Sequence, residues 1–536
     1  MYTIYPIVRR LFFSRETGYS IFAVRLDDKP LAVVRFLEDA EVRYYVDTIE
    51  FSPRNIFMYR RPVLFLKQGL GMRLTGIHAL ELEFVPENLR KLILSILSQQ
   101  NTLARWILLK YNLFKENGGE IREKKGFQAF DKMLEQVVQN VVQKGLSSFQ
   151  RSHLWRRLQS PDLSDEEFLQ FGEFVLLHSL SHVLKNSLET YVGCNTDDLQ
   201  YFLEHPKNPS IRPQSERVRV IIFEDAVGGL GYLKTLAQSI KVDHQEYRRF
   251  IRHLRRTLES YQKHLRRIEG QGSMITANLS PFRSRHAHLV EAIEYAYSML
   301  ERTGIYPHVN SVREVLADRV VSDEDRARLD DMLSYTPLCW DGCQLCVILE
   351  RGCSFINYDQ PFLVSCRLTI KGLETIVNSL EDPKQFRHFV RGIKDTFYNF
   401  IKAARSHIYI TTPWISKNIV DDLLIKANAG VRIRLLVSDD TSNYAHSESL
   451  NYLRQVIAQY SRVEVRLCPS EEIFVHAKGV MVDDCMLLEG SFNLTNNGLK
   501  ESIENVIVSF TSHDALDFAR GFNQLWEQGS NIVKEG

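Results

Sequence analysis

A short stretch near the C-terminus has the residue types needed to break a phosphodiester bond. His476 is followed by Lys478, by Asp483 and by the turn Gly-Ser-Phe-Asn at residues 490–493, which together read H-x-K-x4-D-x6-G-S-x-N. A histidine can attack phosphorus and form a covalent intermediate. Lysine, asparagine and the backbone of a Gly-Ser turn can hold the phosphate oxygens. The pattern therefore predicts a phosphodiesterase site.

Alternating strands and helices must position this motif. His476 and Lys478 fall on an expected strand, where the two-residue repeat directs both side chains to one face. That strand continues to Asp483, and the next strand leads into the turn at Gly490. The alternation of strand and helix before it is typical of an αβ layered domain. The expected strands span residues 407–413, 431–437 and 463–467, and a helix at 416–428 is expected to end at Gly430.

The motif and its surroundings resemble the phospholipase D superfamily, above all its branch of nucleases with a single motif. Glu504 matches the acidic position that this branch carries after its Gly-Ser-x-Asn turn. The segments around Pro413 and Gly430 are also similar to that family. The resemblance covers about residues 370–530 and implies a phospholipase D-like αβα layered domain.

The resemblance also implies a role for each residue of the motif. His476 would form a phosphohistidine intermediate, and Glu504 would orient it as a carboxylate fixes an imidazole tautomer. The lysine, serine and asparagine would hold phosphate oxygens, and the aspartate would support the strand and turn. The mechanism requires no metal ion. The expected catalytic set is His476, Lys478, Asp483, Ser491, Asn493 and Glu504.

The chain carries this motif once, although the mechanism of the family needs two histidines. The second histidine protonates the leaving oxygen and later activates water. The only other H-x-K triplet, at His205, lacks the downstream aspartate and the Gly-Ser-x-Asn turn, and Pro206 within it removes a strand N–H group. The second half of the site is therefore expected from another chain, most simply in a two-fold homodimer.

Length, charge and hydropathy limit the class of protein further. A chain of 536 residues is too long for a single hydrophobic core. Because its net charge is only +1, any surface that binds nucleic acid must be a local basic patch. No apolar run spans a membrane and no signal peptide is evident, which predicts a cytoplasmic protein. We expect an α/β multidomain chain with a β-rich part at 1–85, a mostly helical part at 86–356, a linker near 357–361 and the catalytic domain at 365–536.

Half of the eight cysteines are clustered in the sequence. Four thiolates at close spacing are typical of a closed, tetrahedral structural Zn²⁺ site, with an iron–sulfur cluster as the less favoured alternative. The other four are scattered and are expected to be packing residues. The expected ligands are Cys339, Cys343, Cys346 and Cys353, and the packing residues are Cys194, Cys366, Cys468 and Cys485.

The region upstream of the catalytic domain carries a second resemblance. The strand ending at Glu224, the glycine-rich turn at 228–232 and the cysteine cluster resemble a zinc-binding domain of unknown function that is appended to DNA helicases, including those of bacteriophage defence. This resemblance covers about residues 60–355 and implies a mixed α+β domain. No P-loop motif is present, so a helicase or ATPase would be a separate partner. His178 and His182 are expected to be core or surface residues rather than ligands.

A strongly basic segment at residues 241–270 has an apolar stripe and contains nine cations against four anions. A helix of this kind can follow a phosphate backbone, which predicts salt-dependent binding of nucleic acid. A solvated amphipathic helix is the equally weighted alternative. The expected nucleic-acid contacts are Arg248, Arg252, Arg255, Arg256 and Arg266.

These features predict a dimeric nuclease that acts through a phosphohistidine intermediate, with DNA as the expected substrate and RNA as the alternative. The second resemblance adds a role in antiviral defence beside a helicase or ATPase. Two other functions stay open. One is a DNA-binding adaptor or sensor that recognises phosphate without turnover. The other is a lipid phosphodiesterase, which would need an apolar surface facing the membrane.

Overall fold

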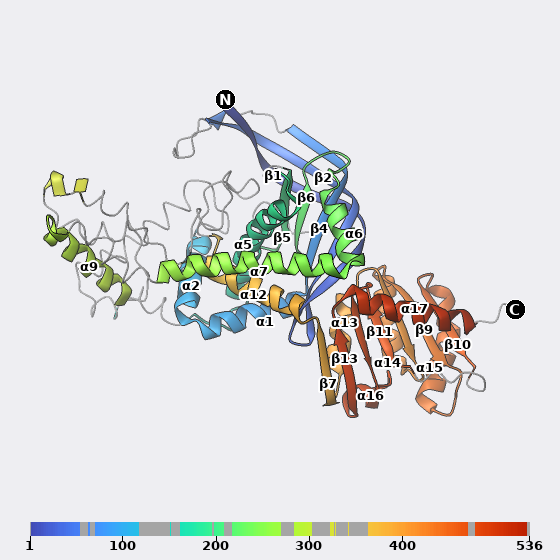
Figure 1. Cartoon of the computed structure of the whole chain (residues 1–536). Helices are drawn as coiled ribbons and strands as arrows, with labels where there is room; N and C mark the ends of the chain where they lie inside the picture. Colours follow the sequence, from blue (N-terminus) through green and yellow to red (C-terminus); the bar gives the residue numbers. More distant parts are fainter. Residues whose placement is uncertain are drawn as a thin grey trace.

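The chain folds into two parts, each built on one β-sheet, and Figure 1 shows the computed structural model with the upstream part in blue to yellow and the C-terminal part in orange to red. The structure describes residues 2–53, 63–64, 70–116, 151, 161–195, 198–207, 217–269, 283–302, 322–325, 327–328, 341, 363–469 and 477–532. The linker expected near 357–361 lies outside the described residues.

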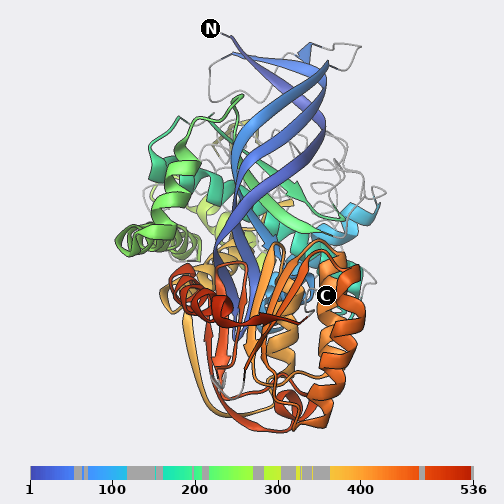
Figure 2. The same cartoon turned by 90° about the vertical axis from the view of Figure 1, so that its right-hand side faces the viewer.

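The upstream sheet is antiparallel, with the strand order β1-β2-β4-β6-β5 and β3 paired to β2. Its longest strands, β1 and β2, meet at a tight turn where Asp27 has a φ of 57°. Figure 2 shows the ribbon of β1 and β2 twisting away from the helices. The strands are β1 Tyr2–Leu26, β2 Lys29–Pro53, β3 Val63–Leu64, β4 Leu70–Phe84, β5 Leu199–Glu204 and β6 Val218–Glu224.

Helices pack on the sheet face that carries Val34, Leu82 and Ile222, and together they form the upstream core. The central helix, α5, is buried on nearly all sides, begins where Asp165 accepts hydrogen bonds from two backbone N–H groups, and ends at Gly193, whose φ is 71°. The helices are α1 Pro86–Gln99, α2 Asn101–Glu116, α5 Glu166–Val192, α6 Tyr232–Val242, α7 His244–Glu269, α9 Ala287–Arg302 and α12 Cys366–Glu381.

The C-terminal sheet has the strand order β14-β10-β9-β8-β11-β12-β13-β7. The strands β8, β9 and β10 are parallel to one another, and the remaining neighbours are antiparallel. The three strands expected from the sequence are β8, β9 and β10, each within one residue at its ends. The strands are β7 Lys384–Arg391, β8 His407–Thr412, β9 Arg432–Ser438, β10 Val463–Cys468, β11 Gly479–Val482, β12 Met486–Gly490, β13 Ile503–Ser509 and β14 Ser530–Asn531.

Helices cover both faces of this sheet. Leu435 and Val480 belong to the core beneath α13, α14 and α15, whereas their neighbours Leu436 and Met481 face α17. The alternation of side chains along each strand thus serves two cores, and it confirms the predicted αβα layering. The helices are α13 Lys394–Ala403, α14 Lys417–Asn428, α15 Tyr444–Val456, the 3₁₀ turn η2 Ile457–Gln459, α16 Asn496–Lys500 and α17 Ser512–Gln528.

The two parts are joined by a packed interface. Ala23 of β1 donates a backbone hydrogen bond to Phe510 at 3.4 Å, and Ala23, Val33 and Val85 are buried in the C-terminal core. Helix α12 lies within the range expected for the catalytic domain, but it packs against α5 and α7 in the upstream core. The polypeptide therefore passes from one core to the other after α12.

Candidate active site

The topology of the C-terminal sheet gathers Lys478, the turn at 490–493 and Glu504 at one edge, which we call the catalytic edge. Lys478 comes directly before β11, Gly490 ends β12 and Glu504 lies at the start of β13. The backbone N–H group of Gly490 donates to the carbonyl oxygen of Lys478 at 3.2 Å. The parallel strands β8 and β9 also end at this edge, where αβ sheets commonly bind ligands. His476 lies outside the described residues.

Lys478 is a buried cation next to a buried carboxylate. The sequence predicts Lys478 on a strand, but β11 begins one residue later, at Gly479. The buried Lys478 therefore directly precedes the strand. Burial lowers the pKa of Lys478, and the negative charge of Glu504 acts in the opposite direction. A partly desolvated ammonium group of this kind interacts strongly with a phosphate oxygen.

Ser491 is engaged with Glu504. Its hydroxyl donates a short hydrogen bond to Glu504 Oε2 and accepts one from the backbone N–H of Asn505 at 3.1 Å. The hydroxyl that the resemblance assigned to phosphate binding thus holds the carboxylate that the same resemblance assigned to orienting His476. This contact is possible because Gly490 lets β12 approach β13 closely: a Cβ atom there would stand 2.2 Å from the carbonyl oxygen of Asn505.

Asn493 presents an unsatisfied polar atom at the same edge. Its Oδ1 is buried and has no hydrogen-bond partner within the described part of the chain. Buried polar atoms normally have partners, so this acceptor oxygen is available to a hydrogen-bond donor outside the described residues. The carbonyl group of Asn493 also lies against Gly498, where a Cβ atom would be 2.4 Å from the carbonyl oxygen.

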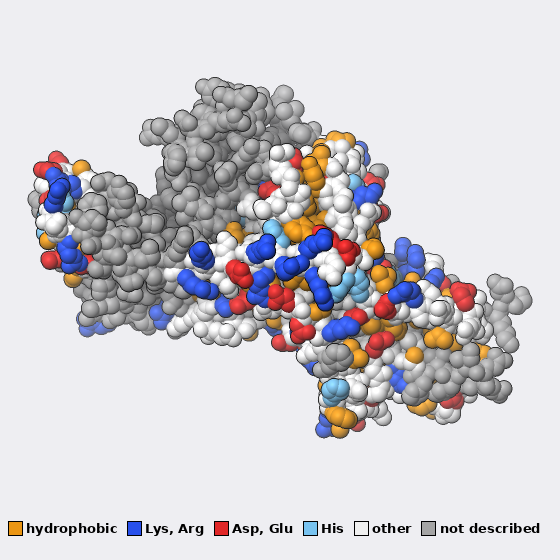
Figure 3. Space-filling view, viewed as in Figure 1, with side chains coloured by type: hydrophobic (Ala, Val, Ile, Leu, Met, Phe, Trp, Pro, Cys, Tyr) orange, Lys and Arg blue, Asp and Glu red, His pale blue; other side chains and the backbone are white. Residues whose placement is uncertain are grey.

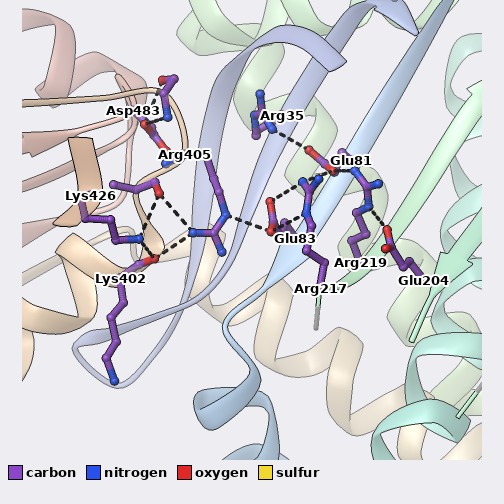
Figure 4. A network of polar contacts seen from close by, with 12 residues as sticks. Arg35, Glu81, Glu83, Glu204, Arg217, Arg219, Lys402, Arg405, Lys426 and Asp483 are labelled. Carbon is purple, nitrogen blue, oxygen red and sulfur yellow. Dashed lines mark hydrogen bonds and ion pairs between the residues drawn. The ribbon is translucent and has the colours of Figure 1, made fainter. Parts of the chain in front are cut away.

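Asp483 lies at the opposite edge of the sheet and fixes the far end of β11 (Figure 4). Its carboxylate accepts the backbone N–H groups of Arg405, Ser406 and His407 at 2.7, 2.8 and 3.0 Å. Asp483 and Asp484 have φ values of 54° and 56°, which form the tight turn between β11 and β12. Asp483 therefore contacts backbone and is remote from the catalytic edge.

Residues that sequence reasoning did not single out tie the loops of the catalytic edge together. His446 Nε2 donates to the carbonyl oxygen of Ser438 at 2.9 Å, and its Nδ1 accepts from the N–H of Ile415 at 3.3 Å. Thr411 Oγ1 donates to the carbonyl oxygen of Ala477 at 3.4 Å. His446 has no local sequence signal, because its partners follow two other strands.

The expected nucleic-acid contacts lie along α7, where Figure 3 shows a row of cationic side chains. Arg248, Arg252, Arg256 and Arg266 are exposed, but Arg255 pairs with Glu381 at 2.8 Å and contacts Asn378 at 3.2 Å. The row borders the Asp483 end of the sheet, because His244 at the start of α7 packs against His513 at 5.2 Å between ring centroids. The cations and the catalytic edge are therefore separated by about the length of a strand, roughly 15–20 Å.

The upstream part contains the second group of expected sites. The four cysteines of the cluster lie outside the described residues. His178 and His182 are buried, their Nε2 atoms share a hydrogen bond of 3.0 Å, and burial lowers the pKa of both. No group of three metal-ligating side chains occurs within the described residues. Of the four cysteines expected to pack, three are buried and Cys194 is half-buried.

The glycine-rich turn at 228–232 connects β6 to α6, and backbone N–H groups within it donate to the carboxylate of Glu224. Glu224 accepts the N–H groups of Gly231 at 2.9 Å and Leu233 at 2.7 Å at the start of α6, and it also accepts the N–H of Leu230. The N-terminus of a helix favours an anion, and here Glu224 supplies it. His205 is also buried in this part, 3.5 Å from Glu173, and lies far from the catalytic edge in the fold.

Comparison with known proteins agrees with this geometry. Residues 397–526 match the family described as "Cardiolipin synthase, PLD-like domain". The C-terminal part of this chain is therefore a phospholipase D-like domain. The predicted resemblance of the upstream part to a zinc-binding domain is not addressed by this match and stays a prediction.

Individual relatives match the same part of the chain. A mitochondrial cardiolipin hydrolase of Chlamydomonas reinhardtii is 26% identical over 132 residues, which are 24% of this chain and 56% of that protein. The chain thus spans about half the length of the curated relative. Among solved structures, the phospholipase D family member Nuc of Salmonella typhimurium is 18% identical with a TM-score of 0.25, covering 28% of this chain and 97% of Nuc. NucT of Helicobacter pylori is 16% identical with a TM-score of 0.24, covering 28% and 98%.

Proposed function

We propose that the C-terminal domain hydrolyses phosphodiester bonds in nucleic acid, with DNA as the first substrate to test and RNA as the second. The observation that carries this proposal is the convergence at one sheet edge of buried Lys478, the Ser491–Glu504 pair and Asn493, whose side-chain NH2 group is of the kind that donates to phosphate. Lysine and asparagine side chains bind phosphate oxygens, and a carboxylate next to them can orient a histidine.

The proposed reaction has two steps. His476 attacks phosphorus, the P–O bond to the leaving group breaks as the N–P bond forms, and a second histidine gives its proton to the leaving oxygen. That histidine then takes a proton from water, whose oxygen attacks phosphorus and releases His476. Lys478 and Asn493 hold the charged oxygens in both steps. The scheme uses no metal ion.

The second histidine is proposed to come from another copy of the chain. One H-x-K-x4-D motif is present per chain, and a two-fold axis brings two identical half-sites together. Arg405, Asp484 and His513 contact the upstream part at the Asp483 end of the sheet, and Asp28 of the β1–β2 turn contacts Arg387 and Thr396.

Nucleic acid is favoured over lipid by the exposed arginines of α7. Three of them, Arg248, Arg252 and Arg256, recur every four residues and so share one face of the helix. Such a row can contact successive phosphates in a salt-dependent manner. The resemblance of the upstream part supports a proposed role in defence against foreign DNA beside a helicase or ATPase. A cytoplasmic location is proposed from the sequence.

The cysteine cluster is proposed to hold one structural zinc ion. Four thiolates fit tetrahedral Zn²⁺. Asp341, which lies between the first two cysteines in the sequence, is fixed in the upstream core: its carboxylate accepts from Ser365 Oγ at 2.8 Å and from Arg367 N at 3.1 Å. Metal analysis should find about one zinc per chain, and chelation should lower the unfolding temperature. A metal-free chain with an unchanged unfolding temperature would refute this assignment.

One assay tests the central proposal. Purified protein is incubated with labelled DNA in EDTA, beside His476→Ala. We expect cleavage by the wild-type protein and a loss of at least about a thousandfold in the variant, because the nucleophile is removed. Binding without cleavage would instead support the adaptor or sensor, in which the fold recognises phosphate without turnover.

Lipid phosphodiester hydrolysis is the second candidate function. The residues Phe389 and Ile503 near the catalytic edge are 82% and 64% exposed, and apolar side chains around a site can enter a lipid surface. The curated relative is named a cardiolipin hydrolase. Within the described residues, no helix is long and apolar enough to cross a bilayer. Hydrolysis of cardiolipin vesicles but not of DNA would replace the first proposal with this one.

A further inference from the structure

The strand behind the catalytic edge is short and is fixed at its far end. β11 has four residues, with Lys478 directly before it and Asp483 directly after it. The Asp483 carboxylate accepts three successive backbone N–H groups, two from the loop between α13 and β8 and one from His407, the first residue of β8. Any movement of that loop is therefore transmitted to the end of β11.

Arg405, the first residue of this group, connects the loop to the upstream part (Figure 4). Its Nε lies 2.9 Å from Oε1 of Glu83 on β4, and the Glu83 side chain is only 3% exposed. The same Oε1 atom also accepts a hydrogen bond from Arg217 Nε at 3.1 Å. Backbone and side chain of Arg405 thus join Asp483 of one sheet to Glu83 of the other.

Glu83 belongs to a network of buried ion pairs. Its neighbour Glu81 is fully buried and accepts from Arg35 at 3.0 Å and from Arg219 at 2.6 Å. Burial would raise the pKa of Glu83, but the charges of Arg405 and Arg217 outweigh burial and hold the pKa at about 2. A buried carboxylate that loses a partner is strongly destabilising, so Glu83 holds Arg405 firmly.

The second aspartate of the turn makes a similar connection. Asp484 lies 3.7 Å from Lys241 Nζ at the end of α6 and 2.9 Å from His407 Nε2. The turn between β11 and β12 therefore rests on the upstream part at two points, through Arg405 to β4 and through Asp484 to α6.

We propose that Glu83 and Arg405 are positioning residues, through which the upstream part sets the alignment of β11 and so of Lys478 at its other end. The inference rests on the proposed phosphodiesterase function of the catalytic edge. β11 is central in the sheet, between β8 and β12, and a slip of one residue would turn each side chain to the opposite face. A small displacement at a reacting group lowers the rate substantially.

Two variants break the ion pair and one serves as the matched control. Arg405→Gln removes the guanidinium but keeps the backbone N–H group that Asp483 accepts. Glu83→Gln removes the partner charge. Lys402→Gln removes a cation at the same interface, where Lys402 and Glu87 are 3.4 Å apart and both 59% exposed. Exposed pairs of this kind contribute little.

The first readout is backbone hydrogen exchange, which does not depend on catalysis. We expect the amides of residues 478–483 to exchange about tenfold faster in Arg405→Gln and Glu83→Gln, and within about twofold of wild type in Lys402→Gln. The acceleration in the double variant should be smaller than the product of the two single accelerations, because both substitutions remove the same contact between Arg405 and Glu83. Arg405→Lys, which keeps the charge, should recover part of the protection.

The second readout is steady-state cleavage of DNA. A positioning role lowers kcat about tenfold with KM within about twofold, because Lys478 is misaligned while the surfaces that bind substrate are intact. Unchanged exchange at 478–483, or equal acceleration throughout the C-terminal domain, would overturn the inference whether or not the protein cleaves DNA. A wild-type protein without cleavage activity would refute the proposed function. Faster exchange at 478–483 in the variants would still show that the contact between Arg405 and Glu83 stabilises β11.

Discussion

At the scale of single residues, Ser491 and Asn493 of the turn at 490–493 have different roles, although the sequence predicts phosphate binding for both. The hydroxyl of Ser491 holds Glu504, whereas the Oδ1 atom of Asn493 is buried without a partner within the described residues. The serine thus contributes to the alignment of a carboxylate, and the asparagine keeps an acceptor atom for a hydrogen-bond donor outside the described residues. Both depend on the close approach of two backbones at Gly490.

Substitution of Gly490 by alanine should destabilise the C-terminal domain. The new Cβ atom would stand 2.2 Å from the backbone carbonyl oxygen of Asn505, and neither β12 nor β13 can retreat without losing strand pairing. We expect a loss of about 3 kcal/mol in the free energy of unfolding, measured by urea denaturation.

Gly521→Ala is the matched control for that prediction. Gly521 lies on α17, and a Cβ atom there meets nothing within 4 Å. Alanine has the higher helix propensity, so the variant should be stabilised by up to ~1 kcal/mol. Equal unfolding midpoints for the two variants would show that the close approach of β12 and β13 at Gly490 does not require glycine for stability.

At the scale of elements, α7 has two faces with separate tasks. Phe250, Leu254 and Leu258 are buried in the upstream core, while the arginines at 248, 252 and 256 are exposed. Arg255, which the sequence grouped with them, turns to Glu381 of α12 and joins two helices instead. One basic segment therefore divides into packing, an ion pair and an exposed row of cations.

Neutralising the exposed row should change the salt dependence of DNA binding. In Arg248→Gln/Arg252→Gln/Arg256→Gln, the slope of log affinity against log salt should become shallower by up to ~2.7, since each lost phosphate contact on duplex DNA accounts for about 0.9. Fluorescence anisotropy across a KCl series measures this slope. The control is Lys91→Gln, which removes an exposed cation on α1. An equal slope in the wild type, the triple variant and the control would show that the arginines of α7 do not contact DNA.

At the scale of the whole molecule, the C-terminal sheet contacts the upstream part near Asp483, and the catalytic edge lies at the other end of its strands. Asp484 and His513 meet the upstream part at the first end. Glu504 lies at the catalytic edge, flanked by exposed Phe389 and Ile503. This division suits a dimer whose catalytic edges meet.

Dilution with an inactive chain tests whether the site is shared. When wild-type protein is co-assembled with an equal amount of His476→Ala, a shared site keeps activity only in wild-type pairs, so about a quarter should remain. An independent site in each chain would leave about half. The measurement is the initial rate of DNA cleavage at constant total protein, with the assembly state followed by light scattering.

Much of the C-terminal domain could be predicted from the sequence, because its signals are local. Apolar runs marked β8, β9 and β10, and Gly430 marked the end of α14. The motif predicted the phospholipase D-like domain, which the family match confirms. The packing of α12 in the upstream core was not predictable, since its apolar stripe suits either core.

The sequence alone was enough to predict a phospholipase D-like domain, because the motif residues, their spacing and the periodicity of the strands and helices are local features. The contacts between distant segments could be seen only in the folded chain. Ser491 meets Glu504, Arg405 meets Glu83 and Arg255 meets Glu381 because packing brings distant segments together, and burial then makes each charge depend on its partner.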